Sequence, residues 1–308
     1  MTDQAPHKRK NLLTGDWVLV SPHRLQRPWQ GEASEAAATP AISYDPDCYL
    51  CPGNKRAGGQ SNPAYSGVYV FDNDYPALLP EAGQPLDDPL LVAEPETGIC
   101  RVICYSPDHS RTMSQMSIDE ITAVVEVWGE QYASLAANPD IAAVTIFENR
   151  GAMMGASNPH PHGQLWATST TPPELARECD QQAAHFQRTG RFLLLDYLDR
   201  EEKAGERIVC STEHFVALVP FWAAWPFETI VLPRRAVGNL ADISASEQRS
   251  LAELLADLTR AYDQLFNTPF PYTMGWHQQP LRDSAEGFLL HAHFYPPLLR
   301  SATVRKHM

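Results

Sequence analysis

The sequence lacks any long, uninterrupted hydrophobic run. Its longest apolar stretch, residues 215–227, is broken by Pro220 and Pro226 and is too short to span a bilayer. The first ten residues, Met1 to Lys10, are polar and contain no apolar segment of the kind found in a secretory signal. These absences predict a soluble, cytoplasmic protein.

Basic residues and cysteines are also scarce. The chain has 24 lysines and arginines against 37 aspartates and glutamates, a net charge of −13. Because this charge repels a phosphate backbone, nucleic-acid binding is not expected, although one local basic pocket for a small phosphorylated ligand remains compatible with it. The six cysteines in 308 residues are expected to be free thiols. The abundant residue is proline, with 26 copies, which predicts short elements and enforced turns.

Two parts of the chain repeat the same order of elements. Ser117 and Ser244 each begin a Ser-x-x-Glu capping box before a helical apolar pattern, and they lie 127 residues apart. Two His-x-His pairs follow, and their second members, His162 and His293, lie 131 residues apart. Strands are predicted at residues 17–20, 67–71, 101–105, 142–147, 160–166, 215–219, 229–232, 272–276 and 289–295. The pattern indicates an internal duplication, with two α+β halves that share one sheet.

Cys48 and Cys51 form a Cys-x-x-Cys pair. Such a pair presents two thiolates from one turn, which is a common half-site for tetrahedral zinc, and His109 and His160 are candidate partners. A redox dithiol or two buried thiols would have the same spacing. The Pro-Gly-Asn turn that follows, without a thioredoxin-like setting, favours a metal.

The segment His160-Pro161-His162-Gly163-Gln164 is typical of a reactive site. A neutral imidazole can act as a nucleophile without a base if its other nitrogen is held by a hydrogen bond. Gln164 returns to the face of His162 and can donate to a phosphoryl oxygen. The preceding loop, residues 148–158, could cradle phosphate oxygens through backbone N–H groups and the Ser157 hydroxyl, or it could be an ordinary loop.

A second set of histidines could hold another metal ion. His291 and His293 share one face of a predicted strand, and with His277 and an acid they would suit zinc or iron. The alternative is a pair of hydrogen-bonded core histidines. Nothing local selects Glu178 over Glu174 as the acid.

Polar residues on two further loops are candidates for ligand contacts. Arg24 and Arg27, three residues apart, could clamp a diphosphate, or they could belong to a solvated loop. Asn73 and Asp74 could pair with ribose or base edges, or they could form a plain turn.

Three strings carry a family resemblance: SNPHPHGQ at 157–164, VPFWAAWPFE at 219–228 and HAHFYPPLLR at 291–300. They closely resemble the galactose-1-phosphate uridylyltransferases, a branch of the histidine-triad superfamily, and the likeness covers nearly the whole chain. The resemblance implies two histidine-triad-like halves, residues 1–178 and 179–308. These would form a mostly antiparallel half-barrel sheet with helices outside, in a homodimer.

The resemblance also implies roles for individual residues. His162 matches the nucleophile, and Gln164 matches the glutamine that stabilises the uridylylated intermediate. The residues that match zinc ligands are Cys48, Cys51, His109 and His160, and those that match the ligands of a second metal, iron or zinc, are Glu178, His277, His291 and His293. The residues expected to contact the nucleotide sugar, some of them across the dimer interface, are Arg24, Arg27, Asn73, Asp74, Asn149, Gly155, Ala156, Ser157, Gln164 and Lys306.

The implied reaction converts UDP-glucose and galactose 1-phosphate into glucose 1-phosphate and UDP-galactose by ping-pong transfer through uridylyl-His162. The alternatives are a nucleotide hydrolase or phosphorylase of the same superfamily, or a non-catalytic, zinc-stabilised protein that binds nucleotide sugars. Two departures from the family accompany the match. Ala156 stands where a cysteine is expected, and the chain stops at Met308, with His307 in place of a phenylalanine. Because family members usually continue into a segment that helps hold the hexose, the second departure bears on hexose discrimination.

Overall fold

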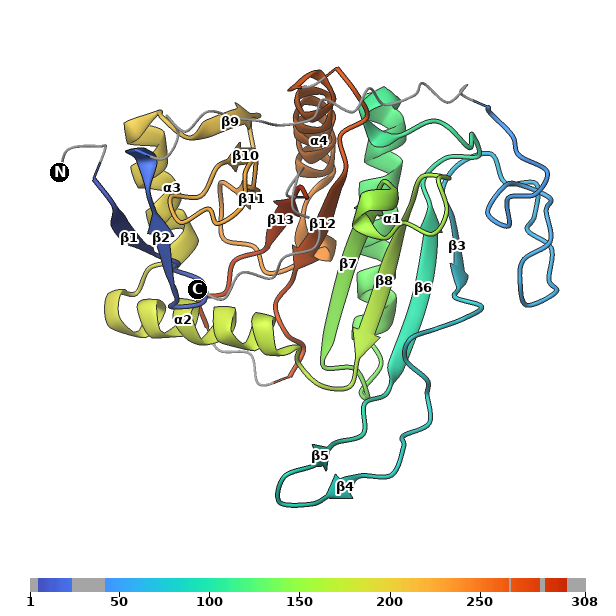
Figure 1. Ribbon diagram of the computed structural model, residues 1–308, viewed down its shortest axis with the longest axis horizontal. Coiled ribbons are helices and arrows are strands. Elements are labelled where there is room, and N and C mark those ends of the chain that lie inside the picture. Colours follow the sequence, from blue (N-terminus) through green and yellow to red (C-terminus); the bar gives the residue numbers. More distant parts are fainter. Residues whose placement is uncertain (1–4, 24–41, 266, 283–285, 298–308) are drawn as a thin grey trace.

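A computed structural model describes residues 5–23, 42–265, 267–282 and 286–297 (Figure 1). The strands are β1 (His7–Lys10), β2 (Trp17–Val20), β3 (Tyr69–Asp72), β4 (Leu86–Asp87), β5 (Val92–Ala93), β6 (Gly98–Cys104), β7 (Ala143–Arg150), β8 (His162–Thr168), β9 (Ile208–Ser211), β10 (Phe215–Leu218), β11 (Thr229–Pro233), β12 (Tyr272–His277) and β13 (His291–Tyr295). The helices are α1 (Ile118–Ala136), α2 (Pro173–Thr189), α3 (Leu193–Ala204) and α4 (Ala245–Leu265), with short 3-10 turns η2 (Met113–Gln115), η3 (Ala152–Met154) and η4 (Leu240–Asp242). Every predicted strand is present.

Nine of the strands form one antiparallel sheet in the order β3-β6-β8-β7-β12-β13-β11-β10-β9. The order reads as two similar units that meet at the β7–β12 pair. In the first unit β3, β6, α1, β7 and β8 follow one another along the chain, and β10, β11, α4, β12 and β13 repeat that sequence in the second. The predicted antiparallel sheet shared by two α+β halves is therefore confirmed. The division at residues 178 and 179, which falls within α2, stays a prediction.

Helices α1 and α4 lie side by side against one face of the sheet (Figure 1). Both begin at the predicted capping boxes. The Ser117 hydroxyl accepts from the Glu120 N–H, and the Ser244 N–H donates to the Glu247 carboxylate at 2.7 Å. Their apolar faces bury a core that includes the fully buried indole rings of Trp128 and Trp276. This shared core holds the two halves together as one body.

Helices α2 and α3 were not expected from the sequence, and they cover the opposite face of the second half. Leu194 and Leu198 of α3 pack there against Val216, Leu218 and other buried side chains of β10 and β11. On the same face of the first half, alternate side chains of β8 are only half-buried. The second half is thus buried on both faces, whereas the first keeps one face accessible.

No helix within the described ranges has the length and apolarity needed to cross a bilayer.

Candidate active site and metal centres

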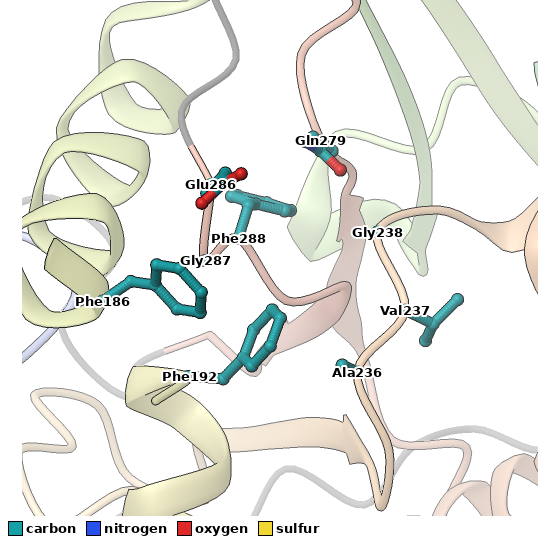
Figure 2. Close-up of a pocket in the computed structure, with 9 residues that line it drawn as sticks. All are labelled: Phe186, Phe192, Ala236, Val237, Gly238, Gln279, Glu286, Gly287 and Phe288. Carbon is teal, nitrogen blue, oxygen red and sulfur yellow. The ribbon is translucent and has the colours of Figure 1, made fainter. Parts of the chain in front are cut away.

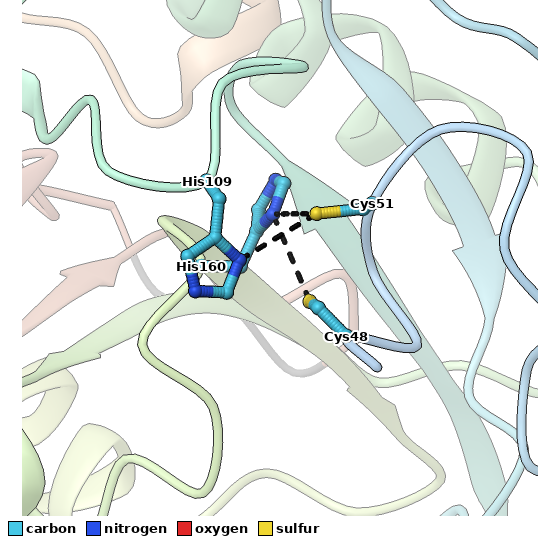
Figure 3. Close-up of side chains that lie close together, drawn as sticks. All are labelled: Cys48, Cys51, His109 and His160. Atoms are coloured by element: carbon cyan, nitrogen blue, oxygen red, sulfur yellow. Dashed lines mark hydrogen bonds between the residues drawn. The ribbon is translucent and has the colours of Figure 1, made fainter. Parts of the chain in front are cut away.

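The first cluster joins two thiols and two imidazoles at one buried point (Figure 3). The Cys51 Sγ lies 3.5 Å from the Nδ1 atoms of both His109 and His160, and the Cys48 Sγ lies 3.9 Å from His160 Nδ1. A tetrahedral Zn²⁺, with bonds of ~2.3 Å to sulfur and ~2.0 Å to nitrogen, separates such ligands by about 3.5 Å. Two thiolates and two neutral imidazoles would also balance its charge. The donor set and its spacing therefore fit zinc.

Local hydrogen bonds prepare these side chains as ligands. The Leu50 N–H points at Cys48 Sγ at 3.3 Å, and Gly53 turns the chain with a φ of 77°. The His160 ring donates from Nε2 to the Ser106 carbonyl oxygen at 2.8 Å, which leaves the Nδ1 lone pair free. Burial lowers the pKa of His160 to about 4, so this ring is neutral near pH 7.

The second cluster places one carboxylate among three histidines. Glu178 Oε2 lies 2.6 Å from His277 Nδ1 and 3.2 Å from His291 Nε2, while Glu178 Oε1 lies 3.4 Å from His293 Nε2. Burial acts to raise the pKa of Glu178, but His277 and His291 outweigh it and hold that pKa well below its usual range. Glu174, the rival acid, is exposed. The structure brings together the four predicted residues.

Two features of this cluster suit a bound cation. The His291 ring donates from Nδ1 to the Leu289 carbonyl oxygen at 2.8 Å, which turns its Nε2 toward Glu178, 3.2 Å away. Neither ring nitrogen of the buried His293 has a hydrogen-bond partner among the described residues. A metal ion at this point would satisfy both the carboxylate and the unpaired nitrogen.

His162 begins β8 and stands outside both clusters. Its ring donates from Nδ1 to the His160 carbonyl oxygen at 2.7 Å, so Nε2 keeps its lone pair. Burial lowers the pKa of His162, and the backbone hydrogen bond offsets only part of that effect. The next residue has to be glycine, because a Cβ on Gly163 would lie 2.3 Å from the Tyr105 hydroxyl. Among the described residues nothing hydrogen-bonds to Nε2, so the result is a neutral, oriented imidazole whose second nitrogen is able to react.

A cavity of about 370 Å³ opens in front of this imidazole. Its walls are formed by Tyr49, Leu50, Ala57, Phe71, Asn73, Asp74, Tyr75, Val102, Ser157, His162 and Gln164. The lining therefore combines aromatic and apolar side chains with hydroxyl, amide and carboxylate groups. This combination suits a ligand with a flat base and a polar, phosphorylated end.

The predicted ligand contacts are distributed unevenly around the cavity. Asn73, Asp74, Ser157 and Gln164 line it. Asn149 lies on β7, on the half-buried face that also carries Phe147, and it accepts a 2.7 Å hydrogen bond from Thr273. Three predicted contacts, Arg24, Arg27 and Lys306, lie outside the described residues, and Gly155 and Ala156 follow η3 without lining the cavity.

Six lining residues were missed by sequence reasoning: Tyr49, Leu50, Ala57, Phe71, Tyr75 and Val102. A signal for the first two was present, because they lie between the cysteines of the Cys-x-x-Cys pair. The Tyr49 hydroxyl reaches to 3.4 Å from the Ser157 Oγ, so the metal knuckle also forms a wall of the cavity. No comparable signal marked Ala57 or Val102.

A separate hollow of about 360 Å³ lies beside α2 and α3 (Figure 2). The rings of Phe186, Phe192 and Phe288 surround it, together with Gln279 and Glu286. Within the described ranges no predicted site residue lines this hollow, so it does not compete with the His162 cavity as the candidate active site.

A duplicated antiparallel sheet that presents a neutral histidine to a cavity with both apolar and polar walls is compatible with a nucleotidyltransferase. Models of the galactose-1-phosphate uridyl transferase N-terminal and C-terminal domains match residues 1–172 and 178–308. The chain belongs to the galactose-1-phosphate uridylyltransferase family.

Individual relatives and solved structures agree with this assignment. The chain is 51% identical over 306 residues to galactose-1-phosphate uridylyltransferase of Haemophilus influenzae, covering 98% of this chain and 87% of that one. It is 46% identical to the Rattus norvegicus protein of the same name, with 98% and 81% covered. A solved structure titled as a uridylyltransferase superposes with a TM-score of 0.74 at 27% identity, covering 98% and 89% of the two chains. An ADP-glucose phosphorylase from Arabidopsis thaliana, with a TM-score of 0.74 and 24% identity over 96% and 90% of the chains, shares the fold.

Proposed function

We propose that this protein is a UDP-glucose–hexose-1-phosphate uridylyltransferase that works by a ping-pong mechanism. The observation that carries the proposal is the free Nε2 of His162, which faces a cavity beside Gln164 and Ser157. The name of the relatives supports galactose 1-phosphate as the substrate that receives a uridylyl group. We propose UDP-glucose as the donor of that group, with glucose 1-phosphate and UDP-galactose as the products.

In the first half-reaction, His162 Nε2 attacks the α-phosphorus of UDP-glucose. An N–P bond forms, the bond from that phosphorus to the bridging oxygen breaks, and glucose 1-phosphate leaves. The Nδ1–H···O=C bond to His160 stabilises the positive charge that the ring gains. In the second half-reaction a phosphate oxygen of galactose 1-phosphate attacks the same phosphorus, the N–P bond breaks, and His162 is regenerated neutral.

The remaining residues of the cavity bind and orient the substrate. The Gln164 amide can donate to an oxygen of the transferred phosphoryl group, and the Ser157 hydroxyl can donate to a neighbouring one. Asn73 and Asp74 suit the hydroxyls of a ribose, with Phe71 and Tyr49 as the walls for the base. Because the leaving group is already a phosphate, positioning and charge stabilisation are the principal tasks.

We assign zinc to the first cluster and iron or zinc to the second. A metal ion in the first cluster would crosslink the knuckle to the segment that precedes β8, and it would thereby hold the His160 carbonyl that orients His162. We further propose a cytoplasmic homodimer in which Arg24, Arg27 and Lys306 complete the nucleotide-sugar contacts.

Incubation with UDP-glucose alone tests the proposal. Intact-mass measurement should find one uridylyl adduct per chain in the wild type and none in His162→Ala. Galactose 1-phosphate should then discharge the adduct and yield UDP-galactose. Discharge by water or by inorganic phosphate instead would assign a hydrolase or a phosphorylase, and UDP-sugar binding without any adduct would indicate a non-catalytic binding protein.

A further inference from the structure

Arg56 lies directly behind the wall of the His162 cavity. Its side chain is 7% exposed, and its Nε is 3.5 Å from Asp74 Oδ2. The guanidinium carbon lies 4.2 Å from the centre of the Phe71 ring. Asp74 and Phe71 both line the cavity, whereas Arg56 does not. One buried cation thus contacts two residues of the candidate nucleoside site from behind.

The loop that carries Arg56 holds this arrangement in place. The Arg56 N–H donates to the Gln60 carbonyl oxygen at 2.7 Å, and its Nη2 donates to the Gln60 side chain at 2.5 Å. Gly58 allows the close approach of the loop, since a Cβ there would lie 2.9 Å from Asp74 Oδ1. The Asp74 carboxylate is therefore confined from two sides.

We infer that Arg56 is a positioning residue for nucleotide-sugar binding, which holds the Asp74 carboxylate and the Phe71 ring in place and offsets the charge of Asp74. This inference rests on the proposed function. A lone carboxylate in the cavity wall would repel the diphosphate of a UDP-sugar, and the repulsion would be strong where water is largely excluded. With Arg56 behind it, Asp74 can accept hydrogen bonds from ligand hydroxyls while the pair as a whole carries no net charge.

Binding of UDP, measured by calorimetry, tests the inference through a double-mutant cycle. Arg56→Gln should weaken UDP binding about tenfold, whereas Arg56→Lys, which keeps the charge, should weaken it only about threefold. In the Asp74→Asn background, Arg56→Gln should change the affinity less than about threefold, because the carboxylate that Arg56 offsets is gone and only its contact with the Phe71 ring is left to lose. An equal loss in both backgrounds, or no loss in either, would overturn the inference.

A second ion pair, which joins β3 to β6 two residues before Asp74, provides a matched control. Arg101 Nε lies 3.1 Å from Asp72 Oδ1, next to the Asp74 region, but the Asp72 side chain is 81% exposed and does not line the cavity. Arg101→Gln should leave UDP affinity within about twofold of wild type. An equal loss from Arg101→Gln would show that any lost strand contact weakens binding, and would overturn a specific role for Arg56.

Kinetics separate positioning from general damage to the fold. For Arg56→Gln the KM for UDP-glucose should rise about tenfold while kcat stays within about threefold. If Arg56→Gln does not fold, Arg56→Lys and its Asp74→Asn double variant complete the same cycle. If the wild type binds UDP but forms no uridylyl adduct, the proposed function is refuted, while the double-mutant cycle on UDP binding can still be measured. If the wild type binds no UDP, the inference about Arg56 is overturned.

Discussion

The two halves of the molecule place equivalent histidines in opposite surroundings. His162 of β8 and His293 of β13 are each the second member of a His-x-His pair, on corresponding strands of one sheet. In front of His162 the sheet face opens into a cavity, while in front of His293 helix α2 brings Glu178 to 3.4 Å. The same strand motif therefore serves as a candidate nucleophile or a candidate metal ligand, depending on what covers it.

The first histidine of each pair shows a related difference. His160 donates from Nε2 to the chain and turns Nδ1 toward its cluster, whereas His291 donates from Nδ1 and turns Nε2 toward its own. The His160 carbonyl oxygen also accepts the hydrogen bond from His162. A ligand of the first candidate metal cluster, His160, thus lies two residues before the reactive ring, while the second cluster, whose His277 ends β12, is separated from β8 by strand β7.

The largest expected effect comes from removing the histidine that lines the cavity. His162→Ala should lower adduct formation from UDP-glucose by about 10³-fold or more, because no other group can form the N–P bond. The circular dichroism spectrum and metal content should be unchanged. The matched variant His293→Ala should still form the adduct but lose one metal equivalent and melt at a lower temperature. Adduct formation by His162→Ala would show that His162 is not the nucleophile and that the two histidines do not differ in the way described above.

Disrupting the two clusters should separate activity from stability. Cys51→Ser should lose one metal equivalent and slow adduct formation more than about tenfold, since the His160 segment is no longer anchored. Glu178→Gln should lose the other equivalent and lower Tm, with a smaller effect on adduct formation. Elemental analysis of both variants measures the lost metal, and adduct kinetics measure the change in activity. Equal loss of activity in the two would show that both clusters support the reactive histidine alike.

The positions two residues further along the strands offer a finer test. Gln164 in β8 corresponds to Tyr295 in β13. Gln164→Ala should slow adduct formation by about 10²-fold, the usual cost of one lost donor to a developing charge. Tyr295→Phe should leave the rate within about twofold. If the rate does not respond to Gln164→Ala, another donor holds the phosphoryl group.

The smallest effects concern the capping boxes of α1 and α4. The Glu247 carboxylate also accepts from Arg235, and this hydrogen bond lowers the pKa of Glu247 to about 2. Because the folded-state pKa lies below the ordinary 4.5, this stabilisation is present above pH 4.5 and is lost as the pH falls toward 2. Glu247→Gln should lower the free energy of unfolding by about 1–2 kcal/mol at pH 7, and Glu120→Gln by about half of that.

Urea titrations at pH 7 and pH 3 measure both variants. The difference in free energy of unfolding between wild type and Glu247→Gln should be smaller at pH 3, where the wild-type carboxylate begins to protonate. An equal difference in free energy of unfolding at both pH values would show that the ion pair between Arg235 and Glu247 contributes nothing to stability.

Much of the fold could be predicted because its signals are local. The capping boxes at Ser117 and Ser244 and the alternation along β8 depend on neighbours in sequence. Helix α2 was missed because its buried face carries Glu178 and Gln182, which interrupt the apolar period on which such predictions depend. Arg56 gave no signal either, since its importance comes from contacts with Asp74 and Phe71, far along the chain.

The amino-acid sequence alone determined helices α1 and α4, most strands of the main sheet, the duplication and the histidine and cysteine pairs of the candidate metal clusters, because periodicity and spacing are properties of neighbouring residues. Only the tertiary structure decided which carboxylate joins the second cluster and which histidine keeps a free nitrogen before a cavity. The physical reason is burial: α2 covers one half of a common sheet face and leaves the other half accessible. Which side chains are covered depends on packing between segments distant in the chain, and no local pattern encodes it.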